Sequence, residues 1–142
     1  MTMIPDADTP RPSLWTALRR GLASRCPACG KGRLFRAYVK VADHCQACGE
    51  AFHHHRADDM PAYLVILIVG HLLVPAMIAV EGAFAPPYWL QMAIWLPATF
   101  AAAVGLLQPV KGGVVALQWA NRMHGFGGEP DTFEPLNAEP GR

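Results

Sequence analysis

The sequence predicts a mainly α membrane protein: a hairpin of two transmembrane helices, preceded by a small N-terminal β ribbon and accompanied by short interfacial helices. Two long segments, 60–80 and 82–110, contain no Asp, Glu, Lys or Arg, and only Glu81 separates them. A membrane-spanning helix needs about 20 apolar residues, which both segments supply. All four cysteines lie ahead of these segments, in two CxxC pairs. Charged residues make up 16% of the chain, against about 25% in an ordinary soluble domain.

The N-terminal region begins with a polar, proline-containing stretch, residues 1–12, which we expect to be disordered. Ser13 is placed to cap a short amphipathic helix over residues 13–22. Leucines recur on one face of that helix, at positions 14, 18 and 22, with arginines on the other side. Two interpretations stay open: the helix lies in the membrane interface, or it packs on the ribbon.

The cysteines predict a metal-binding ribbon over residues 25–52. Their pattern is C-x2-C-x15-C-x2-C, formed by Cys26, Cys29, Cys45 and Cys48. This spacing is typical of a structural zinc site, where two tight turns direct four sulfur atoms at one ion. Gly30 and Gly49 follow the second cysteine of each pair and allow the positive φ that such a turn needs. The apolar residues between the pairs suit a short β-hairpin.

Two disulfides or four free thiols are the alternatives to zinc. Disulfides require an oxidising compartment, whereas the charge pattern described next places this segment in the reducing cytoplasm. Zn²⁺ is therefore the expected cofactor, and four thiolates leave no open position, so its role would be structural. His44 could compete as a ligand, but the paired CxxC pattern favours the thiolates.

The hairpin and its orientation follow from the charges. A polar linker is expected at 53–61, helix one at 62–80, a periplasmic turn at 81–87 and helix two at 88–107. Nine of the twelve lysines and arginines precede the hairpin, three follow it, and the turn has none. The positive-inside rule then puts both termini in the cytoplasm. After Pro109 we expect a separate interfacial helix at 110–123 and a disordered tail at 125–142.

Histidines are the remaining candidate ligands. His71 lies near the middle of helix one, where an ionisable residue suggests an intramembrane contact. The alternative is a neutral imidazole hydrogen-bonded across the helix pair, near Thr99 and Pro97. His53, His54 and His55 could form a second metal site. Consecutive histidines do not converge on one ion, however, so a solvated linker is the simpler interpretation.

The order of these features resembles a family of small bacterial membrane proteins known as domain of unknown function 983. The resemblance covers roughly residues 20–122 and rests on CPACGKGRLF, CQACGEAF, DDMPAYLVILIVGHLLVP, a Pro-Pro-Tyr-Trp turn and QPVKGGVVALQW. One departure is Met60, where similar proteins often have glycine. The resemblance implies a multi-pass protein of the bacterial inner membrane. Some similar proteins are encoded near genes for cytochrome c oxidase subunits and assembly factors.

Three functions remain as hypotheses. We expect a non-enzymatic accessory protein whose partners are the lipid bilayer and a membrane protein, with assembly of a cytochrome oxidase-type complex as one possibility. No nucleophile–base pair or phosphate-binding glycine loop suggests an enzyme. An alternative is metal or redox handling by labile thiolates. A minor alternative is nucleic-acid binding, although basic residues beside a membrane are more simply explained by anionic headgroups. Nothing in the sequence requires an oligomer.

Overall fold

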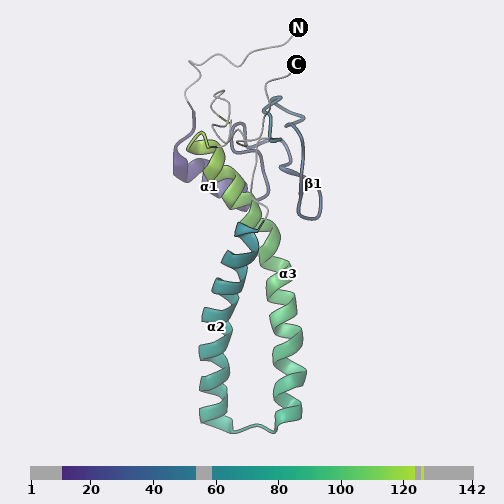
Figure 1. The fold of residues 1–142 in the computed structure, drawn as a ribbon, viewed down its shortest axis with the longest axis vertical. Helices are drawn as coiled ribbons and strands as arrows, with labels where there is room; N and C mark the ends of the chain where they lie inside the picture. Colours follow the sequence, from purple (N-terminus) through teal and green to yellow (C-terminus); the bar gives the residue numbers. More distant parts are fainter. Residues whose placement is uncertain (1–10, 54–58, 124–125, 127–142) are drawn as a thin grey trace, which may run out of the picture.

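The computed structural model describes residues 11–53, 59–123 and 126. The elements in chain order are α1 (Leu14–Leu22), β1 (Phe35–Ala37), β2 (Lys40–Val41), α2 (Met60–Phe84) and α3 (Tyr88–Ala120). Figure 1 shows two parts along one long axis. The hairpin consists of α2 and the lower part of α3, and the head consists of α1, the ribbon and the upper part of α3. The predicted fold class is confirmed: mainly helical, with two long apolar helices and a two-stranded sheet near the cysteines.

Helix α1 begins at the predicted cap. The Ser13 hydroxyl accepts a hydrogen bond from the Thr16 backbone N–H at 3.3 Å, which satisfies one of the free donors of the first turn. Its buried residues are the small ones, Ala17 and Gly21, and they pack against α3. The leucine face is largely exposed, with Leu14 at 49% and Leu22 at 45%. Leu18 and Leu22 nevertheless lie beside Gly113 of α3. The helix is thus packed on the head through Ala17 and Gly21 together with part of the leucine face.

Helix α2 is longer than predicted. It begins at Met60, with Pro61 in its first turn, where a missing N–H costs nothing. It continues through Glu81 to Phe84 and ends at Ala85, which adopts a left-handed conformation with φ of 42°. The expected helix limits of 62–80 and turn of 81–87 were therefore wrong, because only the two prolines at 86 and 87 stop the helix. Glu81 consequently lies inside the helix, and its carboxylate accepts a hydrogen bond from the Gln91 side chain of α3.

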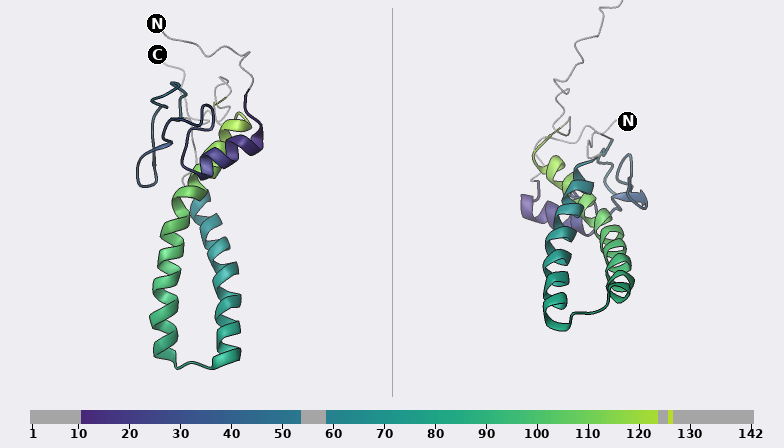
Figure 2. Two further views of the ribbon diagram at one scale, coloured as in Figure 1. Left: turned by 180° about the vertical axis from the view of Figure 1, so that it is seen from behind. Right: turned by 60° about the horizontal axis from the view of Figure 1, so that its bottom comes forward.

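Helix α3 runs unbroken from Tyr88 to Ala120, so the predicted separation into helices at 88–107 and 110–123 was wrong. Pro109 lies inside the helix and removes one backbone hydrogen bond, but it does not end it. The part beyond Pro109 is buried along most of its length, from Gly112 to Ala116 and at Trp119. Figure 2 shows this upper part lying between α1 and the ribbon. Packing on two sides holds the segment in the helix, as the centre of the head and not as a separate interfacial helix.

The hairpin is exposed almost everywhere. The most apolar windows of α2 and α3 have mean hydropathies of 2.5 and 1.7, and both helices are long and apolar enough to cross a membrane. Only 11% of the first window and none of the second is buried, unlike the core helix of a soluble domain. The buried residues of α2 are Pro61, Val65 and Val69, all in its upper half. The two helices are close together at the head and separate below it (Figure 1).

Several predictions fall on residues outside the described ranges: disorder at 1–10, the linker residues 54–58 with His54 and His55, and most of the 125–142 tail. Within that tail Phe126 is described. Its side chain is 6% exposed and belongs to the core cluster of the head, so the disorder expected for the tail does not extend to Phe126.

Candidate metal centre

Each CxxC pair forms a tight turn, called a knuckle here. The Gly30 N–H donates to the carbonyl of Cys26 at 2.8 Å, and the Gly49 N–H donates to the carbonyl of Cys45 at 2.9 Å. The two glycines have φ of 70° and 76°, a conformation that side chains with a Cβ rarely adopt. The requirement for glycine at both positions, predicted from the sequence, is confirmed. The two knuckles therefore have the same backbone hydrogen bond at equivalent positions.

The four sulfur atoms converge, all within 4.8 Å of one another. The Cys26 and Cys48 sulfurs are 3.7 Å apart, and those of Cys29 and Cys45 are 3.8 Å apart. Four ligands placed tetrahedrally about an ion at 2.3 Å would be separated by about 3.8 Å, whereas a disulfide bond is only about 2.0 Å long. All four cysteines are free. The arrangement fits a tetrahedral four-thiolate metal site and does not fit two disulfides.

A third glycine is needed for this geometry, and sequence reasoning missed it. A Cβ at Gly32 would lie 2.2 Å from the Cys45 sulfur, so any larger residue would displace a ligand from the other knuckle. The signal was present as the second glycine of the motif C-G-K-G. Gly32 therefore lets the two knuckles approach closely enough to share one ion.

The thiols differ in acidity. Burial raises the pKa of Cys26 well above its ordinary value, and the nearby Cys48 raises it further. Desolvation also raises the pKa of Cys48, to about 11. Burial acts in the same direction on Cys29, but hydrogen bonds from the backbone N–H groups of Gly32 and Lys31 lower its pKa to about 6. Cys29 is thus the thiolate available at neutral pH, and a cation would have to displace protons from Cys26 and Cys48.

Three side-chain hydrogen bonds, donated by two residues, fix the knuckles to the helices. The Arg20 guanidinium of α1 donates to the carbonyls of Pro27 and Ala28 in the first knuckle, at 3.1 and 2.8 Å. The Trp119 indole N–H of α3 donates to the Glu50 carboxylate, just after the second knuckle, at 2.9 Å. No local sequence pattern reveals either pair.

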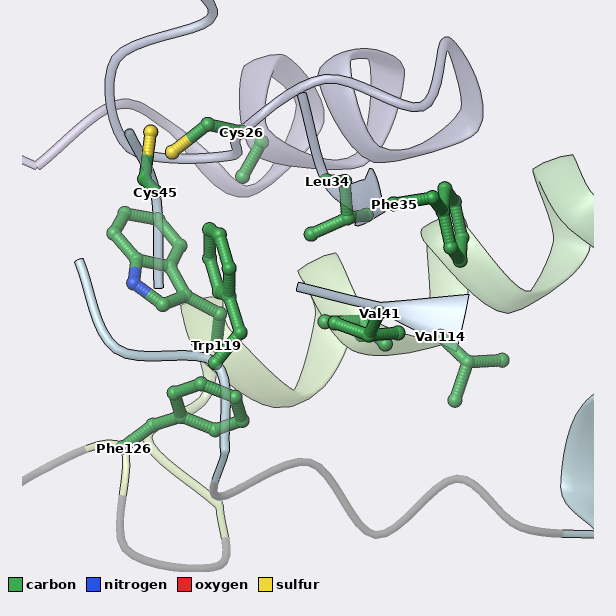
Figure 3. Packing of buried hydrophobic residues seen from close by; sticks show 11 residues of the cluster. Cys26, Leu34, Phe35, Val41, Cys45, Val114, Trp119 and Phe126 are labelled. Carbon is green, nitrogen blue, oxygen red and sulfur yellow. The ribbon is translucent and has the colours of Figure 1, made fainter. Parts of the chain in front are cut away.

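Beneath the sulfurs lies an apolar core. Figure 3 shows Trp119 in one cluster with Cys26 and Cys45, together with Leu34 and Phe35 from the ribbon. The Trp119 side chain is 2% exposed, and Cys26 and Leu34 are fully buried. Because α3 supplies the largest side chain of this cluster, the ribbon is not an independent module in front of a membrane anchor. It is folded onto one of the hairpin helices.

The helices themselves meet backbone to backbone. A Cβ at Gly112 would lie 2.1 Å from the carbonyl oxygen of Gly21, and one at Gly21 would lie 2.4 Å from the Ala116 Cβ. Small residues spaced four apart allow such close helix packing. The spacing occurs on both helices, as Ala17 with Gly21 and as Gly112 with Ala116. It is the signal that could have predicted this contact.

The histidines that the structure describes are not part of the sulfur cluster. His44 and His53 are exposed, and the metal-binding group found among the described residues contains the four cysteines and neither histidine. His71 is exposed on α2, and its Nδ1 is 2.8 Å from the carbonyl oxygen of Leu67 in the same helix. Thr99 likewise donates to Trp95 within α3, at 2.7 Å. The expected hydrogen bond between His71 and helix two near Thr99 is therefore not formed.

A protein-family model matches most of the described head and hairpin. The family model described as protein of unknown function, DUF983, matches residues 35–119, more than half of the chain. The chain belongs to this family. The matched range contains the second knuckle and both long helices, and it begins after the first knuckle. No curated protein and no solved structure matches.

Proposed function

We propose that this DUF983 protein is a non-enzymatic, membrane-anchored accessory protein. Its metal-stabilised head would be held rigidly on the cytoplasmic face, and its hairpin would contact a membrane-protein partner. The observation that carries the proposal is the continuity of α3, which is buried in the head from Gly112 to Ala116 and exposed along its apolar window. A single rigid helix would therefore transmit the position of the head to whatever the hairpin contacts.

Zinc is the metal we propose for the head. Four thiolates in a tetrahedral arrangement suit Zn²⁺, and a site with four protein ligands leaves no position for substrate. When bound, the ion would join the two knuckles and neutralise part of the thiolate charge. The residues that would hold it are Cys26, Cys29, Cys45 and Cys48, whose sulfurs already have the required separations.

The membrane placement rests on the exposure of the two apolar helices and on the distribution of charge. The excess of lysine and arginine around the head, with none in the hairpin turn, supports cytoplasmic termini in a bacterial inner membrane. Cysteine-accessibility labelling of single cysteines introduced at Ala85 and at Ser13 tests the orientation. Labelling of position 85 from the cytoplasmic side would contradict it.

The partner-facing surface proposed here includes His71. This residue is two positions from the buried Val69, about 200° around the helix, so it faces away from α3. Among the described residues no partner is found for its second ring nitrogen. A polar group exposed to hydrocarbon is costly, so a neighbouring protein that supplies a hydrogen bond would stabilise it. A haem–copper oxidase is the partner class that the family resemblance suggests.

Photo-crosslinking in native membranes tests this proposal. A photoreactive amino acid in place of His71 should give adducts with a membrane protein that mass spectrometry identifies. The same group at Val69, which is buried near α3, is the matched control and should crosslink within the chain. If position 71 yields only lipid adducts, the hairpin has no partner on this face and the accessory role is wrong.

Metal handling is the second candidate, because Cys48 is exposed while Cys26 and Cys45 are buried. An exposed thiolate gives an incoming chelator or acceptor protein a point of attack. Zinc at one ion per chain that resists a strong chelator for hours would exclude this function. Release within minutes, with transfer to an apo acceptor, would favour it over a structural role.

A further inference from the structure

A cavity of about 410 Å³ lies where the head meets the hairpin. Its walls come from the end of α1, from strand β1 and the segment before it, and from α3. Three of its lining residues are arginines and the others are neutral. The lining residues that matter here are Ser24, Arg25, Arg33, Phe35, Arg36 and Gln108.

The cavity concentrates positive charge. Arg25 and Arg33 are paired across an antiparallel bridge, which places their Cβ atoms about 5 Å apart. Like charges directly opposite one another repel and destabilise such a pair. None of the lining residues is acidic, and within the described ranges no ion pair or side-chain hydrogen bond is found for these arginines or for Arg36. An anion in the cavity would remove this repulsion.

The cavity lies at the end of the apolar part of α3. Gln108 lines it and directly follows residues 82–107, which carry no charge. The Tyr38 hydroxyl, at the tip of the β-hairpin, donates to the carbonyl of Val104, one helical turn before Gln108. Figure 1 shows the β1 segment extending down beside α3 towards the hairpin. In the membrane placement proposed above, the cavity is therefore level with the lipid phosphates of the cytoplasmic leaflet.

We propose that this cavity binds the phosphate group of an anionic glycerophospholipid. Guanidinium groups bind phosphate oxygens with paired hydrogen bonds, and three of them meet here. The volume lies within the range of small-ligand pockets, and the buried Phe35 ring gives an apolar wall for the glycerol part of the headgroup. The inference rests on the proposed membrane anchoring, because it requires Gln108 to lie at headgroup depth.

Native mass spectrometry of the full-length, metal-loaded protein tests the site. The protein is reconstituted in vesicles of phosphatidylcholine mixed with phosphatidylglycerol, extracted in mild detergent and examined for retained lipid. The variant R33Q/R36Q should retain at least about tenfold less phosphatidylglycerol than the wild type, since each cation near the headgroups contributes to binding. The control R19Q/R122Q removes the same charge from exposed positions outside the cavity and should retain lipid normally.

The outcomes separate this site from the anchoring on which it rests. Anchoring is measured by flotation of the protein with vesicles of phosphatidylcholine alone, which should persist at high salt. A protein that does not float with these vesicles contradicts the membrane placement itself. If the protein floats, but R33Q/R36Q and the control variant retain equal amounts of phosphatidylglycerol, only the lipid site is overturned. Equal occupancy by inorganic phosphate in micelles without anionic lipid would overturn it too, in favour of a free anion. If R33Q/R36Q loses both its metal and its folded structure, a salt titration of the wild type replaces it as the test. Retention of phosphatidylglycerol that does not change with salt concentration contradicts the site.

Discussion

The head and the hairpin share helix α3, and the helix behaves differently in each. In the head, Val115 and Ala116 are fully buried, and the helix packs on α1 and, through Trp119, on the ribbon. In the hairpin, Leu96 is 64% and Phe100 is 73% exposed, although these side chains are larger. Burial in this molecule therefore follows the presence of packing partners and not the hydropathy of the segment.

The comparison also shows how the two environments are encoded. Close packing in the head depends on small residues, because Gly21 and Gly112 let two helix backbones meet. In the hairpin, Gly70, Gly82 and Gly105 have open space where a Cβ would be. The described residues of the head pack on one another, whereas most of the apolar surface of the hairpin is left exposed by the described residues. Substitutions that destabilise the head but not the hairpin test whether the two parts are stabilised independently.

The largest expected effect comes from removing a metal ligand. Cys26→Ser should abolish tight metal binding, and the head should then lose most of the stabilisation that a structural zinc supplies, about 10 kcal/mol or more. The hairpin should keep its helices, because none of its contacts involves the sulfurs. The metal content per chain measures the loss of binding, and trypsin cleavage at Arg33 and Arg36 measures the unfolding of the head. Circular dichroism measures whether the helices of the hairpin remain.

His44→Ala is the control, since His44 adjoins Cys45 in sequence but is exposed and outside the sulfur cluster. It should retain metal and resist trypsin. A Cys26→Ser chain that is metal-free and still resists trypsin would mean that the apolar core, and not the ion, holds the head together.

The next effect is a pH dependence of metal affinity. Metal binds thiolates, and the raised pKa values of Cys26 and Cys48 mean that both are protonated at neutral pH. Binding must then release at least two protons, so affinity should fall about 100-fold for each unit that the pH drops below 7. Cys29, whose pKa is lowered to about 6, adds to this slope only as the pH falls through that value.

Competition with a chromogenic chelator, whose own protonation is corrected for, measures the slope between pH 6 and pH 8. A slope below two protons per ion would contradict the protonated state of these two thiols. The hairpin has no part in this equilibrium, so its helices should persist over the same pH range.

A smaller effect is expected at the glycine contact between α1 and α3. Gly112→Ala places a Cβ 2.1 Å from the Gly21 carbonyl oxygen and should destabilise the head by about 2 kcal/mol through overpacking. Gly105→Ala is the matched control, because it lies in the same helix and its Cβ would meet nothing within 4 Å. Alanine is intrinsically the better helix former, by about 1 kcal/mol, so the control should be neutral or stabilised.

The urea midpoint for metal release measures the stability of the head in both variants. Equal midpoints for Gly112→Ala and Gly105→Ala would show that the two helices do not meet at the glycines. A loss in both would point to a shared effect on α3 and would weaken the division between head and hairpin.

The elements that could be predicted from sequence are those with local signals. The CxxC spacing identified the four ligands, Gly30 and Gly49 identified the turns, and the uncharged segments identified both long helices. The continuity of α3 through Pro109 could not be predicted, because a proline locally favours a break and only α1 and the ribbon stabilise the helix beyond it. The same applies to Arg20, whose knuckle partners lie outside its own helix. Local sequence patterns identified the four metal ligands, but they did not identify the contacts that hold the knuckles against α1 and α3.

The smallest effect we expect is at the hydrogen bond that joins α3 to the second knuckle. Trp119→Phe keeps an aromatic ring in the core but removes the N–H that donates to Glu50. A partly buried carboxylate that loses its donor should cost about 1–2 kcal/mol. Trp89→Phe makes the same chemical change at a hairpin position that is 71% exposed, and should cost nothing measurable.

A double-mutant cycle with Glu50→Ala, which removes the acceptor, separates the bond from the packing of the ring. If the bond joins α3 to the knuckle, the loss in Trp119→Phe should shrink when Glu50 is already replaced, as read from the same urea midpoints for metal release. Full additivity would assign the loss to packing alone. The Trp119 ring would then fill the core beneath the sulfurs without fixing the second knuckle to the helix, and the rigid connection between head and hairpin would depend on Arg20 and the glycine contact.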